Sequence, residues 1–272
     1  MWQSGLCPVE YWRSGRSHRR FPRGLDGHPD YAKVRVALAG TLERKGDEAA
    51  AVAELREGLR FATHANDYLH LGNGLFRGGC RDEAVASYRK AIALDPKLSM
   101  AHYNLGTVLL EKNECREEAV ASFQSAMACT RSAIEANPTD SSLHNQLAWF
   151  LVTCPYAPLR DPVEGVKQVQ KADELTPGNA TICNTLGVAQ YRAENWKEAV
   201  AAFEKSVQLC GGDSYNWFFL AMAHWQLGEK ETARQDFARA VQWMDSNLPN
   251  GKELARFRAE AARLLGVEAT KD

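Results

Sequence analysis

The stretch NTLGVAQYRAENWKEAVAAFEKS, residues 184–206, contains two helical patterns separated by a turn. In the first pattern Gly187 follows Leu186, and a glycine beside a buried leucine lets a second helix approach closely. In the second pattern Phe203 stands between two small residues at helical spacing, four positions earlier and three later. The pair Glu194-Asn195 lies between the patterns, and asparagine tolerates the left-handed backbone that ends a helix. These residues therefore predict a helical hairpin.

The same pattern recurs six times along the chain. Each copy begins with a leucine followed by glycine or alanine, and successive copies are 33, 34, 42, 39 and 34 residues apart. The six pairs are Leu38-Ala39, Leu71-Gly72, Leu105-Gly106, Leu147-Ala148, Leu186-Gly187 and Leu220-Ala221. A period near 34 residues predicts a solenoid of stacked hairpins, each burying its apolar face against its neighbours.

A small–large–small stripe marks the second helix of each copy. The stripes are Ala51, Leu55 and Gly58; Ala84, Tyr88 and Ala91; Ala119, Phe123 and Ala126; Gly165, Val169 and Ala172; Ala199, Phe203 and Ser206; and Ala233, Phe237 and Ala240. Three of these helices are followed by a proline, at positions 96, 138 and 177, which cannot continue a helix.

These recurring residues resemble the tetratricopeptide repeat family over residues 32–248. The resemblance implies an all-α fold, a right-handed superhelical solenoid of about six hairpins. It also implies a concave surface, lined mainly by the first helices, that binds a protein or peptide partner. The fourth copy matches the family least well, and the first lacks both the aromatic residue and the closing proline.

Two irregularities interrupt the period. The third spacing exceeds it by eight residues, seven of them at 127–133. Because seven residues are close to two helical turns, we predict a single helix over 118–136. The fourth spacing exceeds the period by five, which predicts a loop at 154–162. At its end Asp161 suits a helix N-cap and Pro162 suits the first helical position.

The irregularities divide the array into residues 31–138, repeats one to three, and residues 139–250, repeats four to six. Residues 1–30 are rich in Gly, Pro, Ser and Arg, and we expect a disordered basic segment there. Residues 251–266 predict a last helix that caps the final hairpin. Its expected apolar face holds Leu254, Phe257, Ala261 and Leu264, and its expected polar face holds Lys252, Arg256, Glu260 and Arg263.

Composition argues against several functions. With 33 basic and 34 acidic residues the net charge is −1, which gives no field to attract nucleic acid or a membrane surface. The apolar runs are shorter than the ~20 residues that span a bilayer, and the N-terminus shows no secretory pattern. Seven cysteines without a C-x-x-C pair are typical of reduced thiols in a cytoplasmic protein.

Catalytic and metal-binding motifs are missing from the sequence. No H-E-x-x-H string occurs, and no His–Cys pair has metal spacing. His102 and His144 occupy the repeat position that Tyr68 and Trp217 hold elsewhere, which favours packing residues over ligands. Glycines 72 and 74 lie inside a predicted helix and cannot form a phosphate loop. We therefore predict no enzymatic activity, no cofactor and no metal.

Some tetratricopeptide domains grip a C-terminal carboxylate with asparagines and basic residues on first helices. Asn73 and Asn104 match the asparagine positions of that subfamily, but Leu69 stands where a lysine is expected. Repeat four offers Asn145 and Trp149 instead of the basic pair. Without cations a carboxylate loses its charge-assisted bonds, which disfavours such a clamp, although both asparagines suit a peptide backbone.

The resemblance to the tetratricopeptide repeat family implies that the concave positions lie two before, two after and five after each anchor leucine. In repeats four to six they are aromatic and nearly uncharged, a composition typical of interaction surfaces. The predicted partner-binding groove consists of Asn73, Tyr103, Asn145, Trp149, Asn184, Tyr191, Phe218, Met222 and Trp225. We expect an apolar peptide there, unless the loop around Tyr156 or a tight superhelix already buries the aromatic rings.

The sequence thus predicts a non-enzymatic scaffold or adaptor in a bacterial cytoplasm that binds a protein or peptide of unknown identity. One alternative is the detached regulatory region of a Ser/Thr kinase, because the C-terminal half resembles repeat arrays appended to large bacterial proteins of that kind. The chain itself has no V-A-I-K, H-R-D or D-F-G motif. A third possibility is self-association through the solenoid ends.

Overall fold

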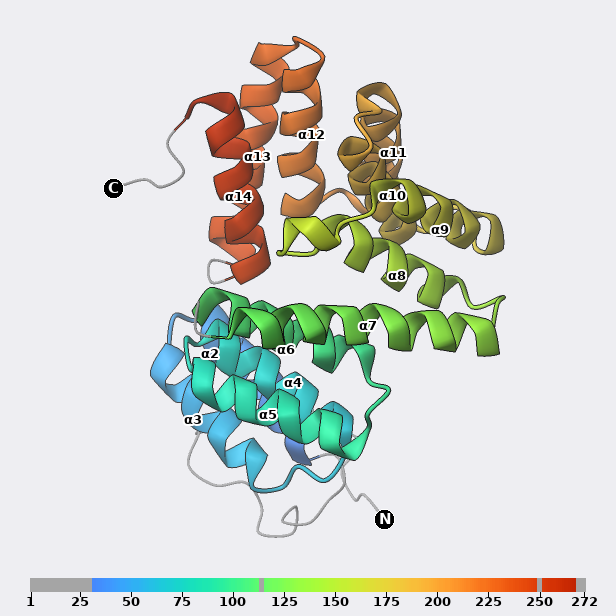
Figure 1. The fold of residues 1–272 in the computed structure, drawn as a ribbon. Helices are drawn as coiled ribbons and strands as arrows, with labels where there is room; N and C mark the ends of the chain where they lie inside the picture. Colours follow the sequence, from blue (N-terminus) through green and yellow to red (C-terminus); the bar gives the residue numbers. More distant parts are fainter. Residues whose placement is uncertain (1–30, 113–114, 249–250, 268–272) are drawn as a thin grey trace, which may run out of the picture. The chain divides into compact units, whose positions relative to one another are not determined.

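The computed structural model describes residues 31–112, 115–248 and 251–267, and within these ranges the chain is all α-helical (Figure 1). Thirteen α-helices, α2 to α14, and one short 3₁₀ helix, η1, account for the ordered elements, and no strand occurs among the described residues. The expected all-α repeat solenoid is therefore confirmed. The predicted basic segment at 1–30 and the turn at 113–114 lie outside the described residues.

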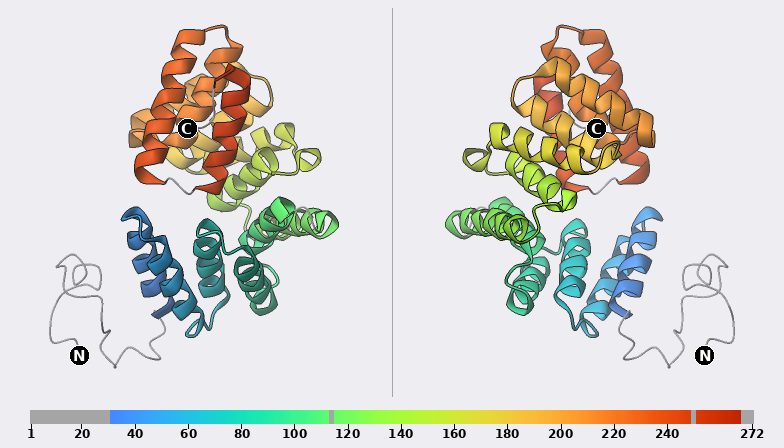
Figure 2. Two further views of the ribbon diagram at one scale, coloured as in Figure 1. Left: turned by 90° about the vertical axis from the view of Figure 1, so that its left-hand side faces the viewer. Right: turned by 90° about the vertical axis from the view of Figure 1, so that its right-hand side faces the viewer.

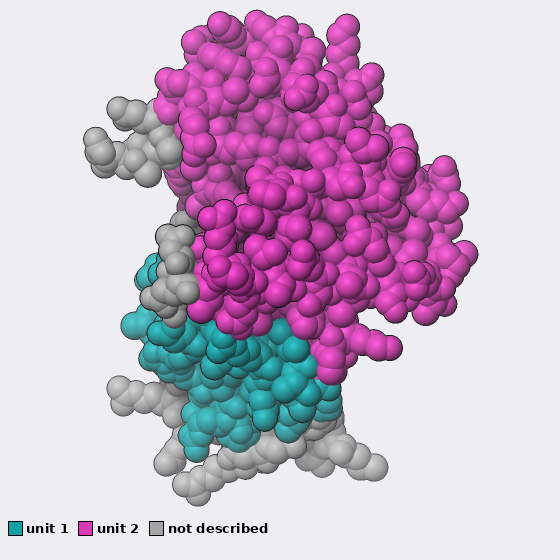
Figure 3. Space-filling view, in the orientation of Figure 1, with its two compact units in different colours: residues 1–94 teal, residues 95–272 magenta. Residues whose placement is uncertain are grey.

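The chain divides into two compact units, residues 1–94 and 95–272 (Figure 3). The first unit contains two hairpins, α2 (Tyr31–Arg44) with α3 (Glu48–Leu59) and α4 (Ala65–Arg77) with α5 (Arg81–Leu94). This division falls after the second hairpin, whereas the spacing irregularities predicted a boundary between the third and the fourth.

The second unit contains four hairpins and a final helix, which Figure 2 shows from two sides. Its elements are α6 (Ser99–Lys112), α7 (Arg116–Ala136), α8 (Ser141–Thr153), η1 (Ala157–Leu159), α9 (Pro162–Leu175), α10 (Ala180–Arg192), α11 (Trp196–Cys210), α12 (Ser214–Gln226), α13 (Lys230–Asn247) and α14 (Lys252–Leu265). Repeats three to six are the pairs α6–α7, α8–α9, α10–α11 and α12–α13, and each first helix packs against the second helix that follows it.

Glycine lets the two helices of a hairpin approach closely. A Cβ added at Gly187 would lie 2.6 Å from the ring of Phe203, and one at Gly72 would lie 2.8 Å from the ring of Tyr88. The same crowding occurs at Gly106, where the nearest ring atom is 2.9 Å away. In these three hairpins the large residue of the second-helix stripe therefore sits on the small residue of the first helix, as the sequence predicted.

Both spacing irregularities have the predicted local structure. Helix α7 runs without a break from Arg116 to Ala136 and includes residues 127–133, so the extended helix is confirmed. Helix α9 begins at Pro162, and the side chain of Asp161 accepts a hydrogen bond from the backbone N–H of Glu164 at 3.0 Å. These contacts confirm the predicted cap.

Histidines at the start of first helices have structural partners. The Nε2 atoms of His102 and His144 lie 3.0 Å from the carbonyl oxygens of Pro96 and Pro138, six residues earlier. Tyr68 donates its hydroxyl to the carbonyl six residues before it in the same way. These side chains tie each first helix to the preceding turn, in agreement with their interpretation as packing residues.

The turn inside repeat five departs from its counterparts. In the turns at Gly46, Gly79 and Gly228 the left-handed residue is glycine, but in repeat five Glu194 takes that conformation, with φ of +64°. The sequence pattern had indicated a turn at the pair Glu194-Asn195 because asparagine tolerates this backbone. An L-residue in this conformation costs about 1–2 kcal/mol.

Replacing Glu194 by glycine is expected to raise the free energy of unfolding by about 1 kcal/mol, because glycine adopts the left-handed region without this cost. Urea denaturation followed by circular dichroism measures the change. The control is Ala201→Gly on the exposed face of α11, which inserts the same residue into a helix and should lower stability by about 0.5–1 kcal/mol. A loss of stability in Glu194→Gly would contradict the left-handed turn.

Candidate partner-binding groove and the C-terminal helix

Helix α14 is the predicted last helix, and its bounds, Lys252–Leu265, confirm the sequence expectation within a residue at each end. It packs beside α12 and α13, as Figures 1 and 2 show. Near its end, Leu265 joins a small apolar cluster with Ala221 and Ala233 of the last hairpin. This part of α14 covers the final hairpin in the way that a capping helix should.

The start of α14 also reaches repeat four. The ring of Phe257 has centroid distances of 4.9 Å to Phe219, 6.0 Å to Tyr215 and 6.4 Å to Trp149. The first two residues belong to α12 and the third belongs to α8. Helix α14 therefore lies against the first helices of repeats four and six. We call the side of α8, α10 and α12 that contacts α14 the first-helix wall.

The sequence predicted that this wall faces solvent, and the structure corrects that expectation. Phe218 and Met222 are fully buried, and Tyr191 is only 7% exposed. Packing of neighbouring helices buries these three residues, which agrees with the alternative that the array itself covers the rings. Tyr156 of the long loop instead lies under the guanidinium of Arg116 on α7, 5.2 Å from its ring centroid. Helix α14, which had been assigned only to the end of the solenoid, adds a cover over Trp149, Tyr215 and Phe219.

The predicted aromatic anchors have different surroundings. Trp149 is half-buried and lies edge-on to Tyr215, 5.8 Å between centroids. Trp225 is also half-buried, and the cations of Lys230 and Arg234 lie over its ring at 5.1 and 5.7 Å. Trp149 thus contacts α14 and its neighbours, whereas Trp225 is covered by side chains of its own hairpin.

Further predicted residues lie in the packed interior. Tyr191 packs between Trp196 and Phe219, with centroid distances of 5.1 and 5.5 Å. Phe218 lies 5.7 Å from Phe237 of α13. These rings hold hairpins together, which explains why the sequence pattern alone could not distinguish them from an exposed aromatic wall.

The predicted polar residues divide between the two units. Asn73 belongs to the first unit, where its Oδ1 accepts a hydrogen bond from Tyr88 at 2.9 Å. Asn145 lies one helical turn before Trp149 on α8, and Asn184 lies two turns before Arg192 on α10, so each shares a helical face with a residue of the first-helix wall. The Oδ1 of Asn145 and the Nδ2 of Asn184 are buried without a hydrogen-bond partner among the described residues. An unpaired buried amide atom is costly, so both atoms are suited to a ligand's backbone.

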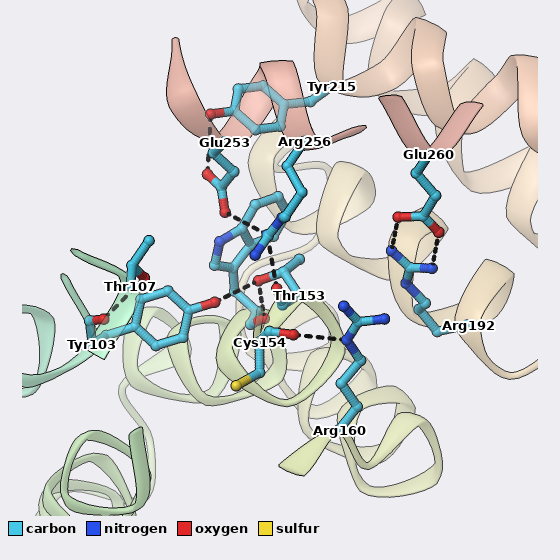
Figure 4. Close-up of polar contacts among 11 residues, drawn as sticks. Tyr103, Thr107, Thr153, Cys154, Arg160, Arg192, Tyr215, Glu253, Arg256 and Glu260 are labelled. Carbon is cyan, nitrogen blue, oxygen red and sulfur yellow. Dashed lines mark hydrogen bonds and ion pairs between the residues drawn. The ribbon is translucent and has the colours of Figure 1, made fainter. Parts of the chain in front are cut away.

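A polar network joins α14 to the wall (Figure 4). Tyr215 donates its hydroxyl to Glu253 Oε2 at 3.1 Å, and Arg256 Nη2 lies 3.5 Å from Glu253 Oε1. The same Nη2 donates to the carbonyl oxygen of Thr153 at 2.8 Å. The hydroxyls of Thr153 and Tyr103 are 3.1 Å apart, so the network extends to α6.

Burial changes the ionisation of this network. The side chain of Glu253 is 32% exposed, yet desolvation raises the pKa of its carboxyl despite the opposing charge of Arg256 and the hydrogen bond from Tyr215. Desolvation and the negative charge of Glu253 raise the pKa of Tyr215, which therefore stays a hydrogen-bond donor. Holding a carboxylate here costs free energy that the neighbouring donors offset.

Three arginines gather farther along α14. Arg192 of α10 grips Glu260 with both Nη atoms, Nη2 lying 2.7 Å from Oε2 (Figure 4). Arg160 donates its Nε to the carbonyl oxygen of Cys154 at 2.7 Å. Desolvation, together with the like charges of Arg192 and Arg256, lowers the pKa of Arg160. Although desolvation opposes it, Arg192 and the other two cations hold the pKa of Glu260 below its usual value.

The sequence pattern placed Arg256 and Glu260 on the polar, solvent-facing side of the last helix, and the structure contradicts this. Both side chains flank the apolar stripe and reach the wall. Glu253 was overlooked, although it lies seven residues before Glu260 and so on the same helical face. The sequence signal that could have indicated a second packing surface was this pair of carboxylates, two helical turns apart and beside Leu254 and Phe257.

A second buried pair lies inside the last hairpin. His224 Nδ1 is 2.8 Å from Asp236 Oδ2, and both residues are buried. The hydrogen bond from His224 to Asp236 raises the pKa of the imidazole; burial opposes this, and the charges of Asp236, Glu229 and Glu204 add to it. Arg239 lies 3.7 Å from the other oxygen of Asp236.

The His224 pair predicts a pH-dependent contribution to stability. A raised folded pKa stabilises the fold fully below the ordinary histidine pKa of ~6.5, and the contribution is lost as pH rises through the folded value. His224→Gln should therefore lose more stability relative to wild type at pH 6 than at pH 8.5, by about 1–2 kcal/mol. Thermal denaturation followed by circular dichroism measures it. The control, His70→Gln at an exposed position, should show no such pH difference, and equal losses at both pH values would refute the assignment.

Other kinds of site are not evident among the described residues. No group of three or more His, Cys, Asp or Glu side chains there is arranged to hold a metal ion. No described helix is both long and apolar enough to cross a membrane. The contacts around α14 remain the most developed set of polar and aromatic interactions between separate repeats.

Family models match two parts of the chain. One, described as a TPR repeat, matches residues 72–113, and the other, described as a tetratricopeptide repeat, matches residues 184–251. Comparison with curated proteins found no match. The first matched segment runs from within α4 past the end of α6, and the second runs from within α10 past the end of α13, so it includes the stretch at 184–206.

Solved structures resemble the chain at low identity. TTC0263, a thermophilic TPR protein from Thermus thermophilus, is 17% identical with a TM-score of 0.54, over 75% of this chain and 100% of its own. A tetratricopeptide repeat protein from Parabacteroides merdae is 14% identical with a TM-score of 0.48, over 86% and 93%. PilF of Pseudomonas aeruginosa is 18% identical with a TM-score of 0.45, over 85% and 98%.

Identities this low show the fold alone. The likeness to TTC0263 agrees with the stacked helical hairpins of this chain, three of which show a glycine of the first helix lying under the large residue of the second. The two family matches show that the chain contains tetratricopeptide repeats, and its all-α hairpin fold is that of a tetratricopeptide repeat protein.

Proposed function

We propose that this chain is a non-enzymatic scaffold that binds a protein partner on the first-helix wall of repeats four to six. Tetratricopeptide repeats in general support protein–protein interaction, which is the broad assignment. One observation carries the specific proposal: the wall already accommodates a helix, α14, through aromatic contacts to Trp149 and Tyr215 and an ion pair to Arg192.

The wall offers the groups that a helix-in-groove interaction uses. Trp149 and Tyr215 supply aromatic contact area, and Arg192 supplies a forked donor for a carboxylate. The unpaired amide atoms of Asn145 and Asn184 supply one acceptor and one donor. Our prediction that these two residues bind a partner's backbone is retained, with the difference that the partner meets a wall now covered by α14.

Cross-linking and affinity capture of the full chain from native cells, followed by binding measurements with the purified partner, tests the proposal. Trp149→Ala should weaken binding at least tenfold, because aromatic anchors dominate interface energies. Lys171→Ala is the control, since this exposed residue lies on α9, a second helix, and pairs only with Glu174 three residues on. A partner that tolerates Trp149→Ala but is lost with Lys171→Ala binds elsewhere.

The alternative function is that this array is the regulatory region of a Ser/Thr kinase. It concerns the larger protein that would contain the array and is compatible with a partner site on the first-helix wall. Kinase motifs in the same reading frame upstream would make the wall a docking region of a kinase, and sequencing that region decides the question.

A further inference from the structure

We infer that α14 is an internal competitor for the first-helix wall and that the partner is a helix presenting the same face. That face carries a leucine and a phenylalanine three residues apart, flanked by two carboxylates seven residues apart. This inference rests on the proposed function and specifies the chemistry of the partner. The template is the face formed by Glu253, Leu254, Phe257 and Glu260.

The apolar half of this face fits the wall closely. Leu254 is fully buried and Phe257 is 1% exposed. The Phe257 ring meets three aromatic rings from two different first helices, so it occupies a position that no single hairpin creates. A partner helix needs an aromatic residue at this position to fill the same space.

The charged half identifies the partner's acidic residues. When α14 leaves the wall, Glu253 and Glu260 leave with it, while Arg192 and Arg160 remain on α10 and in the long loop. Tyr215 also remains, with a hydroxyl that then lacks its acceptor. A wall with two guanidiniums and a phenolic donor beside an aromatic surface is complementary to a helix bearing carboxylates at both positions.

The fit of α14 to the wall is incomplete, which leaves a partner room to compete. The Nε atoms of Arg192 and Arg256 are buried without a hydrogen-bond partner among the described residues. Arg256 also brings a third positive charge close to Arg160. A partner helix with the two carboxylates but without an arginine at the position of Arg256 avoids this repulsion.

A labelled synthetic peptide of residues 251–267 is the probe, and fluorescence anisotropy measures its binding to the full chain. In wild type, α14 covers the wall and reduces the apparent affinity by the fraction of open molecules. Phe257→Ala loosens α14 without altering the wall, so this chain should bind the peptide at least tenfold more tightly than wild type does. Glu260→Gln keeps the volume of the side chain and removes the ion pair, so it should give a smaller gain even if Phe257→Ala folds poorly.

The charge requirement is tested with a matched peptide carrying Glu253→Lys and Glu260→Lys. It should bind the Phe257→Ala chain at least tenfold more weakly than the native peptide. Adding Arg192→Glu to the Phe257→Ala chain should weaken the native peptide and favour the reversed one. Such an exchange of preference would show that the peptide's carboxylate binds at Arg192. A general increase in non-specific binding would strengthen both peptides alike and would not exchange the preference.

Several results would overturn the inference. These are equal binding of the native peptide to wild type and to Phe257→Ala, no binding to either chain, and equal binding of the two peptides. Sedimentation velocity supplies a further check: dimers of the Phe257→Ala chain that the peptide cannot dissociate would make a second copy, not a partner helix, the occupant. If the peptide fails while Trp149→Ala still releases the captured protein, the proposed function stands and this inference falls.

Discussion

Phe257→Ala lowers the free energy of unfolding of the second unit by about 3–5 kcal/mol, the usual cost of removing a buried aromatic ring. The residue is 1% exposed and contacts Trp149, Tyr215 and Phe219. Alanine favours a helix more than phenylalanine does, so the loss must come from packing and not from helix propensity. Urea denaturation followed by tryptophan fluorescence measures this change.

Intrinsic fluorescence suits this measurement because the described tryptophans, at positions 149, 196, 217, 225 and 243, all lie in the second unit. Arg263→Ala is the control, because Arg263 is an exposed residue of the same helix and its removal should change stability by less than about 0.5 kcal/mol. A loss below about 1 kcal/mol for Phe257→Ala would mean that α14 does not pack on the first-helix wall.

The repeat architecture could be predicted from the sequence because its signals are local and redundant. A glycine or alanine beside a leucine, followed by a large residue between two small ones, specifies close packing within one hairpin, and the crowding at Gly187 shows why. The phase of seven inserted residues predicted the length of α7 correctly. Each inference needed only residues within about forty positions of each other, so periodicity was sufficient.

Local sequence patterns did not predict the backbone conformation of one turn. Propensity favoured asparagine for the left-handed position in repeat five, but Glu194 adopts it. The hydrogen bond from Asn195 N–H to the Gln190 carbonyl, at 2.9 Å, closes the turn in the same way as its glycine-containing counterparts. Packing of α10 on α11 thus overrides a local preference worth about 1–2 kcal/mol.

The position of α14 could not be predicted because it depends on contacts between residues far apart in the chain. Arg256 donates to a carbonyl 103 residues earlier, and Arg192 pairs with a carboxylate 68 residues later. The amphipathic pattern identified the helix and its apolar face, but both the end of the last hairpin and the first-helix wall offer an apolar surface. Only the paired carboxylates, Glu253 and Glu260, distinguish the two sites, because the wall holds the matching arginine.

The matching arginine of the wall is Arg192, and we expect the second large effect on the free energy of unfolding when this residue is replaced. Its side chain is 10% exposed and that of Glu260 is 31% exposed, so the pair is more buried than a typical surface ion pair. Arg192→Glu places a carboxylate against Glu260 and also removes a guanidinium lying over the rings of Tyr191 and Phe219. Breaking a buried pair costs about 3–5 kcal/mol, and partial exposure of Glu260 reduces the expected loss to about 2–3 kcal/mol.

Reversing both charges separates the ion pair from the other contacts of Arg192. The double variant Arg192→Glu with Glu260→Arg restores the attraction, but it places the new arginine close to Arg160 and Arg256, whose charges now act on Glu260. We therefore expect recovery of about half of the lost free energy, measured by urea denaturation and tryptophan fluorescence. No recovery would mean that Arg192 acts only through its stacking on Tyr191 and Phe219. Full recovery would mean that Arg160 and Arg256 lie too far away to oppose a cation at position 260.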